Sequence, residues 1–140
     1  MAGRAVALFR RRKHHVIGTS RRDGSPRLSG TEVTIEDGSI GFGVMAGAVR
    51  LADLRRDPRL AIHGQGIDPP EHDHALWEGE VKLSGRALPV APPAGGEAPP
   101  GEFFTVDLDE VVLTSIAPSG DRLVIERWTP AGGVQRVERA

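Results

Sequence analysis

Two groups of basic residues and one histidine-containing segment are the parts of this 140-residue chain whose residue types could do chemistry. The basic groups run over residues 10–13 (RRRK) and 21–27 (RRDGSPR). Basic groups attract phosphates, but the summed charge is only −1 and no aromatic residues are interleaved with them, so we expect no nucleic-acid partner. Glu71–His74 (EHDH) offers two histidines to a zinc ion, yet two ligands in a proline-bounded loop favour a solvated loop, and we expect no metal.

Several other classes of site and protein are excluded or disfavoured by the residue types. The chain has no cysteine, which rules out disulfides, thiolate catalysis and cysteine-ligated zinc. We find no Ser/His/Asp set and no paired carboxylates that would indicate a catalyst built from protein side chains alone. No apolar run approaches the roughly 20 residues of a membrane span, and residues 1–13 lack the apolar core of a signal peptide. We therefore expect a cytoplasmic protein with no membrane partner.

The pattern of turns and strands predicts one domain, residues 1–140, that is mainly β with short helices. Asp-Gly pairs at 23–24 and 37–38 lie between strand-like segments, which is a strong hairpin signal. Residues 91–101 (APPAGGEAPPG) predict a Pro/Gly-rich loop. The helices are expected at 2–12, within an N-terminal helical segment 1–13, and at 49–56. The strands are expected at 14–20, 26–36, 39–45, 60–63, 80–90, 103–116, 122–128 and 134–137. Strands in hairpin order favour an antiparallel barrel.

Periodicity also predicts which residues are buried. In the second helix the expected buried positions are Val49, Leu51, Ala52 and Leu54. In the strand 80–90, the residues Val81, Leu83, Gly85 and Ala87 share one face. The strand 26–36 has no cleanly apolar face, so one of its sides is expected to face something polar.

Residues 18–64 resemble the core of the pyridoxamine 5'-phosphate oxidase-like family. Three pieces carry the resemblance: DGSPR (23–27) after a strand, a glycine-containing strand that ends at MAG (45–47), and LRRDPR (54–59) at the end of the short helix. The resemblance implies an FMN-binding split β-barrel, antiparallel and Greek-key-like. It also implies a homodimer with flavin in grooves at the interface, and a flavin-dependent oxidoreductase acting on a small-molecule substrate.

The resemblance implies a set of cofactor-binding residues as well. The FMN phosphate would lie at the start of the short helix, where backbone N–H groups are unpaired, and the strand 27–33 would line the isoalloxazine ring. The implied residues are Arg27, Ser29, Gly30, Thr31, Glu32, Val44, Met45, Gly47, Val49 and Arg50.

The chain departs from the family pattern at the phosphate site. It has Ala48, Val49 and Arg50 where FMN-binding members often have Ser-Arg-Lys, and Val44 where a threonine is common. Each lost charged contact is worth roughly 1.5–3 kcal/mol, so we do not expect pyridoxamine phosphate oxidase activity itself.

These departures leave three alternatives to FMN. The first is a deazaflavin, coenzyme F-420, and the second is no cofactor at all, in a dimeric binding or structural module. The third is haem, with His63 or His15 as its ligand. A homodimer is expected in each case, because the groove of a split barrel is half a pocket and the strand 103–116 is richer in apolar residues than a small core needs.

Overall fold

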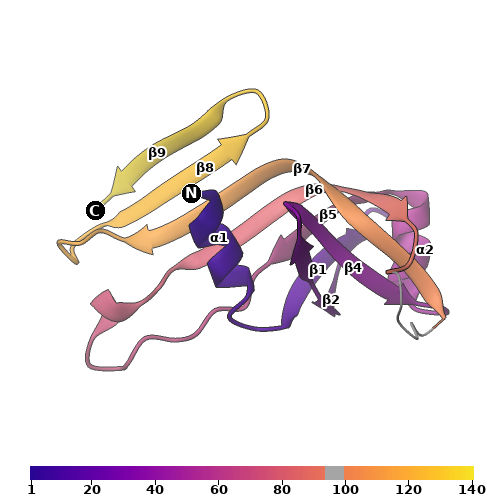
Figure 1. Ribbon diagram of the computed structural model, residues 1–140, viewed down its shortest axis with the longest axis horizontal. Coiled ribbons are helices and arrows are strands. Elements are labelled where there is room, and N and C mark those ends of the chain that lie inside the picture. Colours follow the sequence, from indigo (N-terminus) through magenta and orange to yellow (C-terminus); the bar gives the residue numbers. More distant parts are fainter. Residues whose placement is uncertain (94–99) are drawn as a thin grey trace.

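The computed structural model describes residues 1–93 and 100–140, and it shows a strongly bent antiparallel sheet with two short α-helices packed against it (Figure 1). The strands follow the order β2-β1-β5-β6-β7-β4-β3. In addition, β8 pairs with the second half of β7, and β9 pairs with β8. The helices are α1 (Ala2–Phe9) and α2 (Val49–Arg56), with a 3-10 turn, η1, at His74–Leu76. The strands are β1 (His14–Ser20), β2 (Pro26–Glu32), β3 (Thr34–Glu36), β4 (Ser39–Met45), β5 (Arg59–His63), β6 (Glu80–Val90), β7 (Gly101–Ile116), β8 (Leu123–Thr129) and β9 (Gly133–Arg139).

The sheet bends almost into a barrel but does not close. β2 and β3 end the hydrogen-bonded path, and β2 approaches β4 across the gap without a ladder between them. Inside the bend lies one apolar cluster, to which β1, β5 and β7 contribute Ile17, Ile62 and Phe104. An antiparallel sheet that curls round a core and remains open along one seam is a split β-barrel, as predicted from the sequence.

Both Asp-Gly hairpin signals are confirmed, although the two turns differ. At Asp37 and Gly38 φ is 50° and 77°, so two residues form the turn between Glu36 and Ser39. At the first hairpin Gly24 has φ 85°, while the Arg21 N–H donates to the carbonyl of Ser25. That loop therefore contains one residue more than the Asp-Gly pair.

The single strand predicted for residues 26–36 is two strands. The chain changes partners at Val33, because β2 pairs with β1 whereas β3 pairs with β4. The Val33 N–H donates to the carbonyl of Lys13 at 3.3 Å, outside both ladders.

Several other element boundaries also differ from prediction. α1 ends at Phe9, because the Arg11 N–H returns to the carbonyl of Leu8 in a tightened last turn. The segment between the strands predicted at 60–63 and 80–90 contains η1, which the carboxylate of Asp73 caps. β7 begins at Gly101, within the predicted loop 91–101, of which residues 94–99 lie outside the described part of the chain.

The predicted buried face of β6 is confirmed, but that of α2 is only half right. Leu51 and Leu54 are buried, while Val49 is 61% exposed and Ala52 is also exposed. Asp53 takes the remaining buried position, because partners on the adjoining strands neutralise its charge. Both α-helices have eight residues, and no helix in the described ranges is long and apolar enough to cross a membrane.

Candidate functional site

A groove of about 890 Å³ runs along the open seam of the barrel. Its walls come from β2, β3, β4 and β7, from the start of α2, and from the segment that follows β6. This volume falls within the range of small-molecule sites. The groove therefore has the size and position of a ligand-binding site.

The floor of the groove is largely backbone and aromatic ring. A Cβ built at Gly30 meets no atom within 4 Å, so nothing covers the β2 backbone there. On the opposite wall the ring of Phe103 lies against Gly43, where a Cβ would be 3.1 Å from the ring. Phe42 and Phe104 stack with centroids 5.4 Å apart and also line the groove. Such a surface suits a flat, partly apolar ligand.

One end of the groove is positively charged. Arg50 lines it from the first turn of α2, and the Arg50 Nε is buried without a hydrogen-bond partner among the described residues. In the described part of the chain no side chain caps the N-terminus of α2, whose N-cap residue is Ala48. Unpaired N–H groups beside a buried guanidinium nitrogen form a donor set for an anion.

The other end is acidic. His14 and Glu32 are directly opposite each other on β1 and β2, and the His14 Nε2 lies 3.3 Å from a Glu32 oxygen. Glu36 and Asp37 line the same end, and all four side chains are exposed. These groups can orient polar or cationic parts of a bound molecule by hydrogen bonding.

The structure brings six of the ten implied site residues into the groove lining. These six are Gly30, Thr31, Glu32, Val44, Met45 and Arg50. The other four do not line it. Ser29 and Val49 are not among the lining residues, Gly47 forms the turn before α2 with φ 83°, and Arg27 contacts Asp53.

Several lining residues were not identified from the sequence, among them His14, Phe103 and Thr105. Phe103 and Thr105 reach the groove because β7 pairs with β4, opposing Phe103 to Gly43 and Thr105 to Gly41. The strand-like, apolar residues of 103–116 indicated a strand but not its neighbour.

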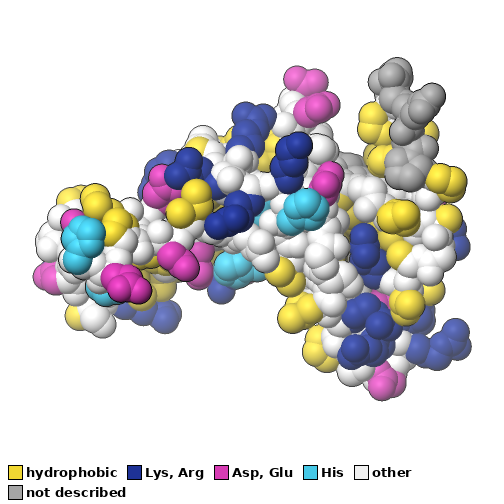
Figure 2. All heavy atoms as spheres, turned by 90° about the horizontal axis from the view of Figure 1, so that it is seen from below, with side chains coloured by type: hydrophobic (Ala, Val, Ile, Leu, Met, Phe, Trp, Pro, Cys, Tyr) yellow, Lys and Arg dark blue, Asp and Glu magenta, His cyan; other side chains and the backbone are white. Residues whose placement is uncertain are grey.

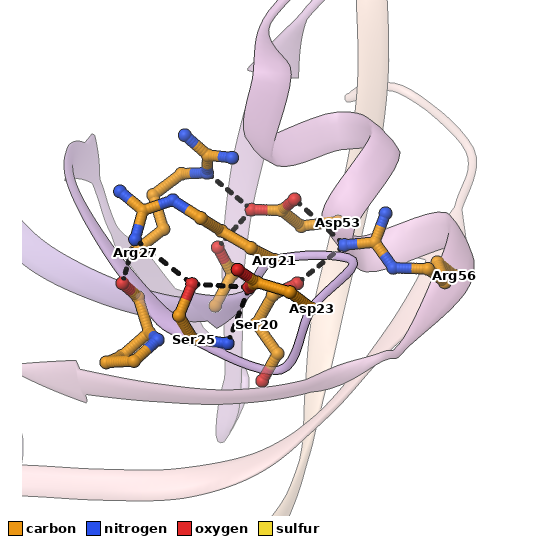
Figure 3. A network of polar contacts seen from close by, with 9 residues as sticks. Ser20, Arg21, Asp23, Ser25, Arg27, Asp53 and Arg56 are labelled. Carbon is orange, nitrogen blue, oxygen red and sulfur yellow. Dashed lines mark hydrogen bonds and ion pairs between the residues drawn. The ribbon is translucent and has the colours of Figure 1, made fainter.

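Arg27 belongs to a buried ionic network under α2 (Figure 3). Asp53, 2% exposed, accepts hydrogen bonds from Arg27 Nε at 2.7 Å, Thr19 Oγ1 at 2.8 Å and an Arg56 terminal nitrogen at 3.1 Å. Burial raises the pKa of Asp53, but the hydrogen bonds from Arg27, Thr19 and Arg56 outweigh it and hold that pKa below its usual range. Arg27 thus joins β2 to α2.

The two histidines considered as haem ligands lie outside the groove lining. His15 is 1% exposed, and its Nδ1 accepts the Gln65 N–H at 2.9 Å. Burial lowers the pKa of His15. His63 is half-exposed and lies 3.4 Å from Glu80. Neither position supports a haem ligand in the groove.

No protein-family model and no curated protein matches the sequence. Solved structures do match it in three dimensions. A pyridoxamine 5'-phosphate oxidase-related, FMN-binding protein from Nostoc punctiforme is 8% identical over 99% of this chain and 94% of that chain, with a TM-score of 0.68. PhzG from Burkholderia lata, in complex with tetrahydrophenazine-1-carboxylic acid, is 11% identical over 99% and 87%, with a TM-score of 0.67.

A heme-binding protein from Mycobacterium smegmatis is also similar, at 12% identity over 96% of this chain and 85% of that chain, with a TM-score of 0.62. Proteins that bind different ligands therefore share this architecture, and at such identities the likeness concerns the fold. The chain has the split β-barrel fold of the pyridoxamine 5'-phosphate oxidase-like proteins.

Proposed function

We propose that this protein is an FMN- or deazaflavin-dependent oxidoreductase with a small-molecule substrate, related to pyridoxamine 5'-phosphate oxidase. The observation that carries the proposal is that the Nε of Arg50, a residue lining the groove at the uncapped start of α2, is buried without a hydrogen-bond partner among the described residues. A phosphate placed there would receive the hydrogen bonds that Arg50 and the first turn of α2 leave unused.

The remaining groove residues would position the ring system and the substrate. The uncovered backbone at Gly30 and the ring of Phe103 offer flat surfaces on opposite walls. The His14–Glu32 pair lies at the other end from Arg50 and would orient the polar part of a substrate. The bound flavin would supply hydride transfer, while these side chains supply binding, orientation and exclusion of water.

The groove lacks several phosphate donors that an FMN site would use. Val44 and Ala48 carry no hydroxyl. Val49, which is 61% exposed, does not supply a second positive charge. Coenzyme F-420 is the natural alternative, because its long phosphodiester tail depends less on one phosphate pocket.

A homodimer is part of the proposal. Large apolar side chains at and beside the groove are exposed, including Met45 at 63%, Val90 at 45% and Leu88 at 45%. A second copy that covered them would also convert the open groove into a closed pocket. A monomer in light scattering at micromolar concentration would contradict this arrangement.

The test is a fluorescence titration of the purified protein with FMN and, separately, with coenzyme F-420. We expect one of them to bind, and Arg50→Gln to weaken that binding at least tenfold, because a charged hydrogen bond contributes roughly 1.5–3 kcal/mol. Arg139→Gln, an exposed position on β9, is the matched control and should leave affinity unchanged. Equal affinity of the Arg50 variant and wild type would refute the assignment of Arg50 as the residue that binds the phosphate.

The second candidate function is a cofactor-poor dimeric binding or structural module on the same barrel. Val44 and Ala48 favour it, since they remove hydroxyl donors from the groove. Failure of both flavins to bind at high micromolar concentration would select this function. A Soret band during haem titration would instead indicate a haem-binding barrel.

A further inference from the structure

A second pocket, of about 380 Å³, lies at the C-terminal end of α2, whereas Arg50 lines the groove from the N-terminal end of this helix. Four arginines and one aspartate provide its charged lining. We call it the arginine pocket, and its charged residues are Arg21, Arg22, Arg56, Arg59 and Asp57. It shares no lining residue with the groove. Figure 2 shows lysine and arginine side chains gathered at the end of the molecule that carries α2 in Figure 1.

The backbone of the first hairpin holds two of these arginines in place. An Arg21 terminal nitrogen donates to the carbonyl of Pro26 at 2.6 Å, and an Arg56 terminal nitrogen donates to the carbonyl of Ser20 at 2.8 Å. The first bond lies within the β1–β2 hairpin, and the second ties that hairpin to the end of α2, as Figure 3 shows. The two guanidinium groups are therefore oriented before any ligand arrives, which lowers the entropic cost of binding.

The carboxylates near the arginine pocket only partly balance its charge. Asp57 is bound by Arg59 through both oxygens, which lowers the pKa of Asp57 to about 2 and keeps it ionised. Asp53 is shared between Arg27 and Arg56. Asp23, in the turn itself, is bound by Ser25, and that contact lowers its pKa.

Counting Arg27, which shares Asp53 but does not line the pocket, five arginines are balanced by only three carboxylates, so positive charge is in excess. Arg22 is exposed and lines the pocket, and no hydrogen bond or ion pair holds it within the described residues. An oxyanion with several oxygens could accept from Arg22 and from the unused nitrogens of its neighbours at once.

We propose that the arginine pocket is a second anion site, which binds the phosphate or pyrophosphate group of a small molecule independently of the groove. A pocket of 380 Å³ accommodates such a group with several further atoms. A long polyanion such as nucleic acid fits less well, because the chain has a net charge of −1 and only 4% aromatic residues.

The probe is inorganic pyrophosphate, titrated calorimetrically into the full-length protein at 150 mM salt so that weak long-range attraction is screened. We expect saturable binding that Arg22→Gln weakens about tenfold and that Arg22→Gln/Arg59→Gln weakens further. Both side chains are exposed, and unchanged circular dichroism would confirm that the variants fold. Arg139→Gln, on β9, is the matched control and should bind as wild type does.

Arg50→Gln separates this site from the groove. If pyrophosphate binds here, that variant keeps its pyrophosphate affinity, whereas Arg22→Gln keeps its flavin affinity. The proposal is overturned if pyrophosphate does not bind at millimolar concentration, if Arg22→Gln binds it as tightly as wild type, or if Arg50→Gln is the variant that loses it. None of these results bears on whether a flavin occupies the groove.

Discussion

Replacing Asp53 by asparagine tests the ionic network that joins α2 to the barrel. Asparagine has nearly the same shape, but it removes the one carboxylate that, within residues 1–93 and 100–140, both Arg27 and Arg56 contact. Two guanidinium groups would then face each other across a neutral amide. The Thr19 hydroxyl, which donates to the same carboxylate in a buried position, would lose a charged acceptor.

The expected loss of unfolding free energy at pH 7 is about 2–3 kcal/mol. Breaking a buried ion pair costs about 3–5 kcal/mol when the remaining charge is sealed from water. The lower figure applies here because the side chains of Arg27 and Arg56 are 24% and 32% exposed and can be rehydrated in part. With a urea dependence of about 1–3 kcal/mol per molar, the unfolding midpoint should fall by about 0.7–3 M.

The pH dependence of the same difference identifies the charge as the cause. Because the pKa of Asp53 is lowered in the fold, its stabilisation is present above the ordinary value of 3.8 and is lost as the pH falls below that value. The difference in unfolding free energy between wild type and Asp53→Asn should therefore decrease between pH 7 and pH 3, as measured by urea denaturation. Asp109→Asn, on the exposed side of β7, should show neither effect. The reasoning would be refuted if wild type and Asp53→Asn had equal unfolding free energies at pH 7, or if their difference stayed constant down to pH 3.

Two further predictions concern stability. The buried His15 has a pKa below 6.5, so the fold should lose stability as the pH falls through about 6.5. The variant His15→Asn keeps an acceptor for the Gln65 N–H and should remove this pH dependence. Thermal melts at pH 7.5 and pH 5.5 measure it. An unchanged pH dependence in the variant would show that another group causes it. Gly85→Ala should cost about 1–3 kcal/mol in urea denaturation, because its Cβ would lie 2.2 Å from the carbonyl oxygen of Asp107 at the β6–β7 bulge. In the control Gly3→Ala the new Cβ has no atom within 4 Å. Equal stability of the two variants would mean that the backbone at the bulge shifts to accommodate the added methyl group.

The parts of the fold that the sequence predicts best are those set by neighbouring residues. The turn at Asp37-Gly38 requires positive φ at two consecutive positions, and this pair tolerates it. The alternation along Glu80–Val90 identified the buried face of β6 because every second side chain points to the core. Partner choice is different in kind. Nothing local to Val33 indicates that the chain leaves β1 there and joins β4, since both segments are equally extended.

The candidate site illustrates the same limit. The resemblance led to Glu32 and Arg50 because their motifs lie within one continuous stretch of chain. His14 was missed because its position depends on the length of the first hairpin loop. A two-residue turn at Asp23-Gly24 would oppose His14 to Val33, and the longer loop that forms opposes it to Glu32 instead. One residue in a turn thus decides which side chain reaches the groove.

The composition of α2 shows why the two proposed anion sites need different numbers of cations. At the N-terminus of α2 the helix dipole and unpaired N–H groups already attract an anion, so Arg50 is the one guanidinium that α2 adds to the groove. At its C-terminus the dipole repels an anion, and an oxyanion there must be held by side chains alone. The arginine pocket meets this requirement with Arg56 and three further arginines from the adjoining turn and strand. Asp53 lies between the two ends, and because Arg27 and Arg56 already occupy its oxygens, it does not compete for Arg50.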